Sequence, residues 1–183
     1  MIRGERVSIR LFQEKDLDVY CRYISEIGEI GEFWPMHLYS EVSMRNRFKE
    51  NGFWDQERGG SMAIADKDDE LIGQLNLFKG IPYTDGFEIG YRMFRPEDRG
   101  KGYMTEALRL FTDYLFELKP INRLQVCFDL DNHASRIVAE KCGFISEGVL
   151  RGCIFHKGVY VDICITSMLR NEWVKRKSLP VSK

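Results

Sequence analysis

A short basic segment that contains two glycines has the composition of a phosphate-binding loop. It reads Arg99-Gly100-Lys101-Gly102-Tyr103-Met104-Thr105 and lies between a strand-like and a helix-like run. Glycine lets the backbone turn tightly and approach a ligand, and the first N–H groups of a helix beginning near Thr105 lack intrahelical partners. Such amides favour an anion. A basic loop that merely ends a strand on the surface would have the same composition. The neighbouring sequence must therefore decide between a phosphate-binding loop and an ordinary surface loop.

The loop differs from the two common nucleotide-binding motifs. No Lys-Ser or Lys-Thr pair closes it, as the triphosphate P-loop requires, and it lacks the three-glycine spacing of the dinucleotide fingerprint. ATP and NAD are therefore disfavoured as ligands.

Composition predicts one ordinary globular domain over residues 1–183. With 44% hydrophobic residues the chain can bury a sizeable core. The formal net charge is -1, from 27 basic and 28 acidic residues, which gives no reason to expect nucleic acid or an anionic membrane as a partner.

The cysteines and histidines indicate neither disulfides nor a metal. The 5 cysteines include no Cys-x-x-Cys pair, which is typical of reduced thiols in a cytosolic protein, and the 3 histidines show no metal-ligand spacing. No apolar run resembles a signal peptide or could span a bilayer. We expect a cytoplasmic protein without a metal.

Hydrophobic periodicity predicts the order of the elements. The strands expected in the N-terminal part and the middle of the chain cover residues 7–11, 61–65, 71–78 and 87–94, and the helices cover 14–25 and 43–51. Residues 28–60 otherwise form an irregular region.

The later part of the chain predicts a β-α-β unit. A helix from Thr105 ends before Pro120, and the strand 124–130 can then run parallel to 87–94 through that crossover. Asn132 is suited to cap a helix that ends before Gly143, strands near 144–149 and 159–168 complete the sheet, and 171–177 form a last helical turn. The fold class is α+β with a mixed sheet.

Two segments together carry a resemblance to a known family. The glycine loop with Glu106-Ala107, and the segment from Asn132 to Phe144, closely resemble the two coenzyme A motifs of the GNAT N-acetyltransferase superfamily. Arg10-Leu11 with Asp16-Leu17, the strand Glu88-Ile89-Gly90-Tyr91, and the tail from Asp162 to Trp173 look like its RimJ/RimL type. The resemblance implies a mostly antiparallel twisted sheet flanked by helices, with an acetyl-CoA-binding core at 87–145 and an acceptor side at 28–60.

The resemblance implies acetyl-CoA as the cosubstrate and assigns the residues that hold it. The pyrophosphate would lie on the amides of Arg99 to Thr105, where Met104 replaces the family's usual small residue and must turn its side chain away. The pantetheine arm would pair with the backbone of Arg92, Met93 and Phe94, as a peptide adds to a sheet edge. Asn132 and Ser135 would also contact the coenzyme.

The expected chemistry is attack of a primary amine on the thioester, without a covalent enzyme intermediate. Glu88 is our first choice for the base, directly or through a water, with His156 and Asp162 as weaker alternatives; an ordinary ion-paired or solvent-facing glutamate is the competing interpretation. A backbone N–H near Met93 or Phe94 would polarise the carbonyl. In many relatives a tyrosine acts as the general acid at the position where this chain has Ala139. Here Ser135, with or without a water, would instead protonate the thiolate.

Recognition of the acceptor would fall to the irregular region and to the last strands. The candidates are Trp34, Tyr39, Tyr160 and Asp162, with Glu88 at the reacting amine and with Phe33, His37 and Glu32 nearby in sequence. A protein N-terminus, a polyamine, an amino sugar and an amino acid all remain open as acceptors, and a homodimer is compatible with the sequence.

Two other function classes remain as alternatives. A non-catalytic acetyl-CoA-binding or sensing module is motivated by Ala139, and a basic RNA-binding domain is disfavoured by the near-zero net charge.

Overall fold

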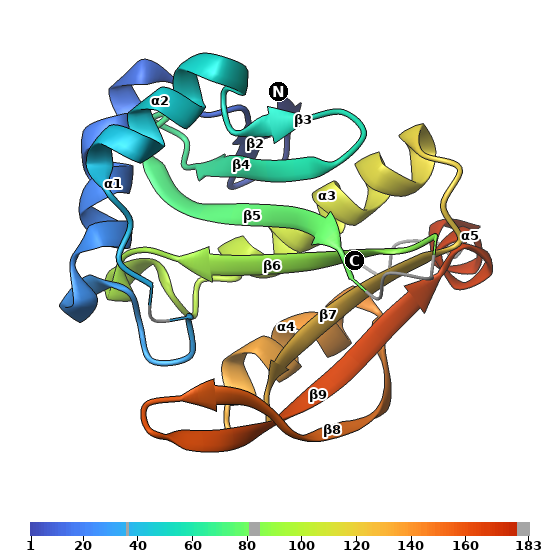
Figure 1. The fold of residues 1–183 in the computed structure, drawn as a ribbon. Helices are drawn as coiled ribbons and strands as arrows, with labels where there is room; N and C mark the ends of the chain where they lie inside the picture. Colours follow the sequence, from blue (N-terminus) through green and yellow to red (C-terminus); the bar gives the residue numbers. More distant parts are fainter. Residues whose placement is uncertain (36, 81–84, 179–183) are drawn as a thin grey trace.

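The computed structural model describes residues 1–35, 37–80 and 85–178. It forms a strongly curved sheet with helices on both faces (Figure 1). The strands are β1 (Ile2–Arg3), β2 (Ser8–Arg10), β3 (Trp54–Asp55), β4 (Gly59–Ala65), β5 (Leu71–Lys79), β6 (Phe87–Met93), β7 (Arg123–Asp129), β8 (Ile145–His156) and β9 (Val159–Leu169). The helices are α1 (Leu17–Ser25), α2 (Glu41–Asn51), α3 (Tyr103–Leu118), α4 (His133–Cys142) and α5 (Arg170–Ser178).

The sheet is mixed and mostly antiparallel, as the sequence predicts. The described strands are ordered β1-β2-β4-β5-β6-β7-β9-β8, with β3 beside β4. β6 and β7 are the parallel pair and α3 connects them, which confirms the predicted β-α-β unit. The short strands β1 and β3 were not predicted, because strands of two residues carry no usable periodicity.

The parallel pair is short, and this shapes the site. Only Phe87 and Glu88 on β6 pair with Leu124 and Gln125 on β7, although both strands continue to Met93 and Asp129. β6 and β7 part toward their carboxyl ends (Figure 1). The edge of β6 that faces β7 is therefore unpaired over Ile89 to Met93 among the described residues.

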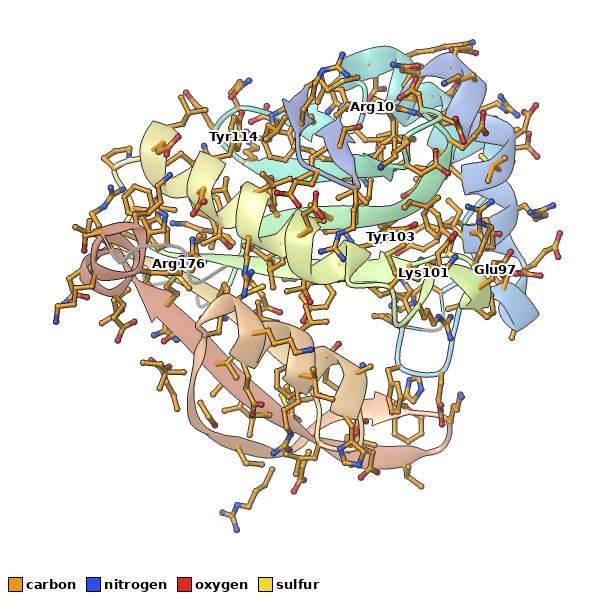
Figure 2. The ribbon with its side chains drawn as sticks, turned by 180° about the vertical axis from the view of Figure 1, so that it is seen from behind. Arg10, Glu97, Lys101, Tyr103, Tyr114 and Arg176 are labelled. Carbon is orange, nitrogen blue, oxygen red and sulfur yellow. The ribbon has the colours of Figure 1, made fainter. Side chains whose placement is uncertain are left out.

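Alternation along the strands builds a core on each face. On β4, Met62 and Ile64 join the larger apolar cluster with α3 and α4, whereas Ala63 points the other way, into a smaller cluster with α1 and α2. Figure 2, seen from behind, shows α3 and α4 across the first of these faces. The two faces thus carry different helices, one pair from the β-α-β region and one from the N-terminal region.

Candidate active site

The glycine loop presents unpaired backbone amides at the start of α3. Gly100 and Gly102 adopt positive φ angles of 74° and 80°, which favour glycine. Gly102 caps α3 without a side-chain hydrogen bond, and the first amide of the helix that is bonded is that of Glu106, 3.1 Å from the Gly102 carbonyl oxygen. Figure 2 shows Lys101 and Tyr103 at this end of α3. The amides and the helix dipole together suit a pyrophosphate.

The methionine in this loop follows its predicted orientation. The Met104 side chain is buried and belongs to the core beneath the helix, so only its backbone faces the loop. The departure from the family's small residue therefore leaves the anion site open.

The N-terminal segment holds the loop in place. Arg6 donates from Nη1 to the Lys101 carbonyl oxygen at 3.0 Å and from Nε to the Glu106 carboxylate at 2.9 Å. Glu106 also accepts from the backbone N–H groups of Arg6 and Val7. Burial tends to raise the pKa of Glu106, but these hydrogen bonds lower it below the ordinary value. The ionised carboxylate therefore ties α3 to the segment before β2, and Arg6 of that segment binds the loop.

The three residues predicted to bind pantetheine through their backbone, Arg92, Met93 and Phe94, do not all point their amides toward the open edge of β6. The Phe94 N–H donates to the Ile72 carbonyl oxygen at 2.9 Å, so it is already used by the chain segment that carries β5. Because successive residues of a strand point their N–H groups to opposite edges, Arg92 also faces β5 and Met93 faces the gap toward β7. The predictions for the backbone of Arg92 and Phe94 are therefore corrected, and of the three residues Met93 is the one whose amide lies at the open edge.

Glu88 lies where β6 and β7 part. Its Oε2 accepts a hydrogen bond of 2.8 Å from Nε2 of Gln125, its register partner on β7. Gln125 was not predicted, because nothing in the alternating pattern distinguishes it. Cys127 lies two residues further along the same face, where burial and then the Glu88 carboxylate raise the pKa of its thiol. A thiol held protonated is a poor nucleophile.

The N-terminus of α4 brings two predicted residues and one unpredicted residue together. Asn132 caps the helix, and its Oδ1 accepts from the Ser135 N–H at 3.0 Å, which confirms the predicted cap. Tyr91 extends from β6 and donates its hydroxyl to the Ser135 carbonyl oxygen at 3.2 Å. Ala139 is fully buried in the core. Tyr91 was missed because alternation on its own suggests a core aromatic.

A pocket of about 220 Å³ opens on the opposite face of the sheet, between α1, α2 and strands β4 and β5. Its lining combines aromatic, amide and hydroxyl side chains with one guanidinium: Tyr20, Trp34, Tyr39, Arg47, Ser61, Gln74, Asn76 and Phe78, beside Ile24, Met44, Gly60 and Leu77. Phe78 is the register partner of Glu88, so this pocket adjoins the proposed base. Burial raises the pKa of Tyr20 to about 12, which keeps this wall neutral.

The structure places two predicted acceptor residues elsewhere. Tyr160 is 72% exposed and packs against Phe155 in the β8–β9 hairpin, and Asp162 accepts a 2.8 Å hydrogen bond from the Gly152 amide across that hairpin. Neither lines the pocket, whereas Trp34 and Tyr39 do. His156 makes a 2.8 Å hydrogen bond through Nε2 with the Glu32 carbonyl oxygen. The hairpin therefore contacts the irregular region, and this ring nitrogen of His156 already has a partner.

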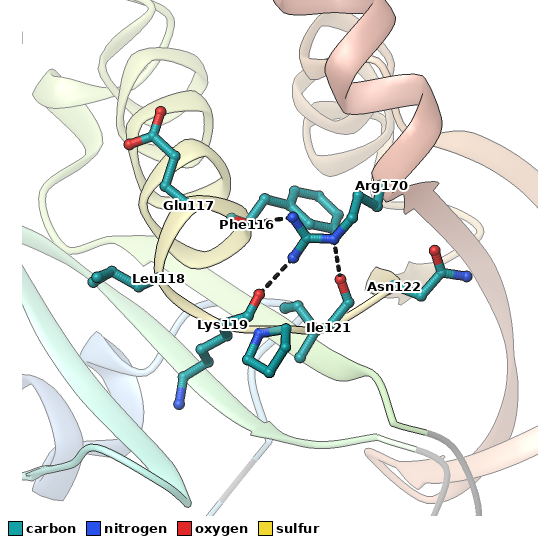
Figure 3. Close-up of a pocket in the computed structure, with 8 residues that line it drawn as sticks. Phe116, Glu117, Leu118, Lys119, Ile121, Asn122 and Arg170 are labelled. Atoms are coloured by element: carbon teal, nitrogen blue, oxygen red, sulfur yellow. Dashed lines mark hydrogen bonds between the residues drawn. The ribbon is translucent and has the colours of Figure 1, made fainter.

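A second hollow, of about 610 Å³, lies at the C-terminal end of α3. Arg170 donates there to the carbonyl oxygens of Phe116, Lys119 and Ile121 (Figure 3). Arginine near a helix C-terminus satisfies the last carbonyls. The 16-residue α3 separates this end from the glycine loop by roughly 24 Å. The contacts explain Arg170 as a structural residue.

The described residues contain neither a group of His, Cys, Asp or Glu suited to a metal ion nor a helix long and apolar enough to cross a membrane.

The comparisons with known proteins decide the family. Residues 6–145 match the acetyltransferase (GNAT) domain. The chain belongs to the GNAT acetyltransferases. Its RimJ/RimL-like type is supported by YdaF of Bacillus subtilis, provisionally named as a ribosomal N-acetyltransferase, which is 29% identical over 95% of this chain and 97% of YdaF. The ribosomal-protein-serine acetyltransferase of Escherichia coli is 29% identical over 71% of this chain and 72% of its own length.

Solved structures agree in fold. A GNAT-family acetyltransferase from Bacillus anthracis has a TM-score of 0.77 at 26% identity and covers 93% of this chain and 98% of its own. RimL, solved with coenzyme A, has a TM-score of 0.79 at 20% identity over 92% of this chain and 97% of its own.

Membership confirms several expectations from the sequence. This GNAT protein is an acetyl-CoA-dependent N-acetyltransferase, so the sensing module and the RNA-binding domain are not supported. The free amides of the glycine loop and the open edge of β6 are compatible with its cosubstrate.

Proposed function

We propose that the protein acetylates a primary amine, either a protein N-terminus or a small amine, which enters from the pocket between α1, α2 and β5. The observation that carries the proposal is the position of Glu88. It stands where β6 and β7 part, with the unpaired β6 edge on one side and the pocket residue Phe78 on the other. A base at this junction can reach an amine from the pocket and a thioester at the edge.

Each proposed step uses a residue of this arrangement. When bound, acetyl-CoA supplies a thioester carbonyl carbon that an amine can attack. Glu88 accepts the proton of the ammonium, directly or through a water, which frees the nitrogen lone pair. The Met93 amide donates a hydrogen bond to the carbonyl oxygen as negative charge develops there.

The remaining step is departure of the sulfur. As the C–N bond forms and the C–S bond breaks, the thiolate receives a proton from the Ser135 hydroxyl or a water it holds. The proton that the new amide nitrogen gives up passes through water and restores the hydroxyl or water that donated. Direct transfer is favoured because Cys127, the thiol beside Glu88, is held protonated by burial and by that carboxylate.

Relatives support both acceptor classes. The Escherichia coli relative is named for ribosomal-protein serine, and the Vibrio cholerae relative, 26% identical over 81% of this chain, is named spermidine N(1)-acetyltransferase. Neither name decides the acceptor here.

Thiol release from acetyl-CoA, measured with a panel of amines and N-terminal peptides, tests the proposal. We expect release that depends on the acceptor, together with acetyl-CoA binding measured by calorimetry on the same sample. Binding without release for any amine would contradict it.

A further inference from the structure

The acceptor pocket is electropositive. Among the described residues that line it, Arg47 is the one that carries a formal charge, and it has no carboxylate within ion-pair distance in that part of the chain. The ion pairs of α2 among the described residues are those of Arg45 with Asp18 and Glu41. The charge of Arg47 is therefore available to a ligand.

A second cation lies beside a residue of the pocket wall. Arg92 is 9% exposed and is the register partner of Gln74 on β5, a lining residue. Its guanidinium lies between the rings of Trp34 and Phe94, with centroid distances of 5.2 Å and 4.8 Å. It donates to the carbonyl oxygens of Tyr23 and Ile30 at 2.7 Å and 2.9 Å. No carboxylate pairs with it among residues 1–35, 37–80 and 85–178.

The other buried arginine shows that this arrangement is unusual for the chain. Arg10 is 2% exposed and is paired with two carboxylates, those of Asp16 and Asp69, each at 2.6 Å. Buried charges are ordinarily paired, because desolvation of an unpaired ion is expensive. Burial without a counterion also lowers the pKa of Arg92 to about 10. An anion in the pocket would supply the missing countercharge.

The pocket also has an unused hydrogen-bond acceptor. Gln74 is 3% exposed, and its Oε1 is buried without a partner, while its Nε2 donates to Asn76 Oδ1 at 3.3 Å. An unpartnered buried polar atom in a binding site is a sign of a ligand group that completes it. A donor such as a peptide N–H or an amine would satisfy this oxygen.

The spacing along β6 orders the two ends of the site. Glu88, Gly90 and Arg92 lie on the same face, and Glu88 and Arg92 are roughly 13 Å apart at about 3.3 Å per residue. Gly90 between them has no side chain, and a Cβ there would meet the Phe78 ring at 3.4 Å, so the ring of this lining residue packs over Gly90 between the two ends. The proposed base therefore lies at one end of this face of β6 and the buried guanidinium at the other.

We propose that the acceptor carries a carboxylate in addition to its primary amine, and that Arg47 binds this carboxylate at the α2 side of the pocket. This inference rests on the proposed function, since it takes this pocket as the acceptor site. Both a free acidic amino acid and the N-terminus of an acidic peptide have the required chemistry. A polyamine would bring further positive charge against Arg47 and Arg92, and is disfavoured.

The test compares acceptors that differ in charge alone, using the full chain. Thiol release is measured with C-terminally amidated peptides beginning Ser-Glu, Ser-Gln and Ser-Lys, with the α-amides of glutamate and glutamine, and with spermidine, so that the neutral member of each pair has no carboxylate. We expect kcat/KM for the acidic member of each pair to exceed that of the neutral member by about tenfold, the lower end for a hydrogen bond to a charged group. The peptide and amino-acid arms show which source of carboxylate is used.

Variants on one helix then assign the effect. Arg47→Gln should abolish the preference, and Arg47→Glu should reverse it toward the Ser-Lys peptide. Arg45→Gln is the matched control, because Arg45 lies on the same helix but is paired with Asp18 and Glu41 and does not line the pocket. Circular dichroism and acetyl-CoA affinity verify that each variant is folded.

Two different failures are distinguishable. Acetylation of the panel without regard to charge, a preference for spermidine, or a preference that survives Arg47→Glu would overturn this inference and leave the proposed function intact. Absence of acceptor-dependent thiol release with every amine would overturn the proposed function itself.

Discussion

A polar side chain of this protein can belong to the candidate site or serve the local structure elsewhere, and its contacts decide which. Asn132 and Asp162 both have a side-chain oxygen that can accept a hydrogen bond, and the sequence makes both candidates for the site. Asn132 caps α4 beside Ser135, while Asp162 binds the Gly152 amide in a distant hairpin. The chemistry of a residue thus followed from its type, and its part in the site followed from its neighbours.

At Glu88, replacement by glutamine tests the role of base. Glu88→Gln should keep the hydrogen bond from Gln125, because the amide oxygen still accepts, but it cannot take a proton. We expect kcat to fall by about 10²–10⁴-fold while acetyl-CoA affinity changes little. Steady-state kinetics and calorimetry provide the two numbers. Turnover within a few fold of wild type would assign the proton transfer to another group.

At Ser135, removal of the hydroxyl should slow the step that protonates the thiolate. Ser135→Ala leaves the backbone hydrogen bonds with Asn132 and Tyr91 in place, because neither uses the side chain. We expect kcat to fall by about tenfold, the effect of one net hydrogen bond of about 1 kcal/mol or slightly more. An unchanged rate, measured with a saturating acceptor, would show that water alone is sufficient.

At the scale of elements, the glycine loop depends on a contact with the segment before β2, which lies far away in the sequence. Glu106 in the first turn of α3 accepts hydrogen bonds from the Arg6 side chain and from two backbone amides. The glycines allow the loop its conformation but also leave its backbone free to move. By holding Arg6, the Glu106 carboxylate reduces the conformational freedom of the loop.

Loss of that charge should weaken acetyl-CoA binding. Glu106→Gln removes the negative charge and turns an N–H₂ group toward Arg6, so we expect a several-fold rise in the Kd for acetyl-CoA, corresponding to about 1 kcal/mol. Glu41→Gln is the control, since Glu41 forms an exposed i,i+4 pair with Arg45 worth about 0.3–0.5 kcal/mol. Calorimetry should find the Kd of the control unchanged.

The same carboxylate predicts a pH dependence of stability. The folded-state pKa of Glu106 is below its ordinary value of 4.5, so the stabilisation is fully present above 4.5. It is lost as the pH falls through the lower folded-state pKa, because the protonated group binds Arg6 less well. Denaturant unfolding should therefore show a gap between wild type and Glu106→Gln at pH 7 that narrows below pH 4.5. A gap that is constant with pH would contradict this account.

At the scale of the molecule, one sheet separates the helices that carry the proposed coenzyme side from those beside the proposed acceptor pocket. The larger core cluster lies under α3 and α4, and the smaller under α1 and α2. Phe111 is fully buried in the larger cluster, with its ring 6.1 Å from that of Trp54. The helix that carries the anion site is therefore fixed by core packing.

Truncation in this core should destabilise the whole fold. For Phe111→Ala we expect a loss of about 3–5 kcal/mol in the free energy of unfolding. At about 2–4 °C per kcal/mol for a chain of this size, Tm should fall by roughly 6–20 °C. Val174→Ala on α5, where the side chain is 52% exposed, is the control and should change Tm by little. A shift of similar size in both variants would indicate that Phe111 packing is not decisive.

The sequence by itself determined most of the elements and the conformation of the glycine loop. Alternation and helical periodicity placed β4 to β7 and α3 within a few residues of their observed ends, because burial of one face imposes those periods locally. The glycines at 100 and 102 and the cap at Asn132 are also local, since each acts within one turn of backbone.

Only the tertiary structure decided which residues meet. The pairing of Glu88 with Gln125, the approach of Tyr91 to Ser135, and the use of the Phe94 amide by Ile72 each join positions more than twenty residues apart. The hydrogen bonds of Arg92 with the Tyr23 and Ile30 carbonyl oxygens, beside the proposed acceptor pocket, also join distant positions. Such contacts depend on strand register and on the point where β6 and β7 part, and these follow from the packing of the whole chain because no local pattern specifies them.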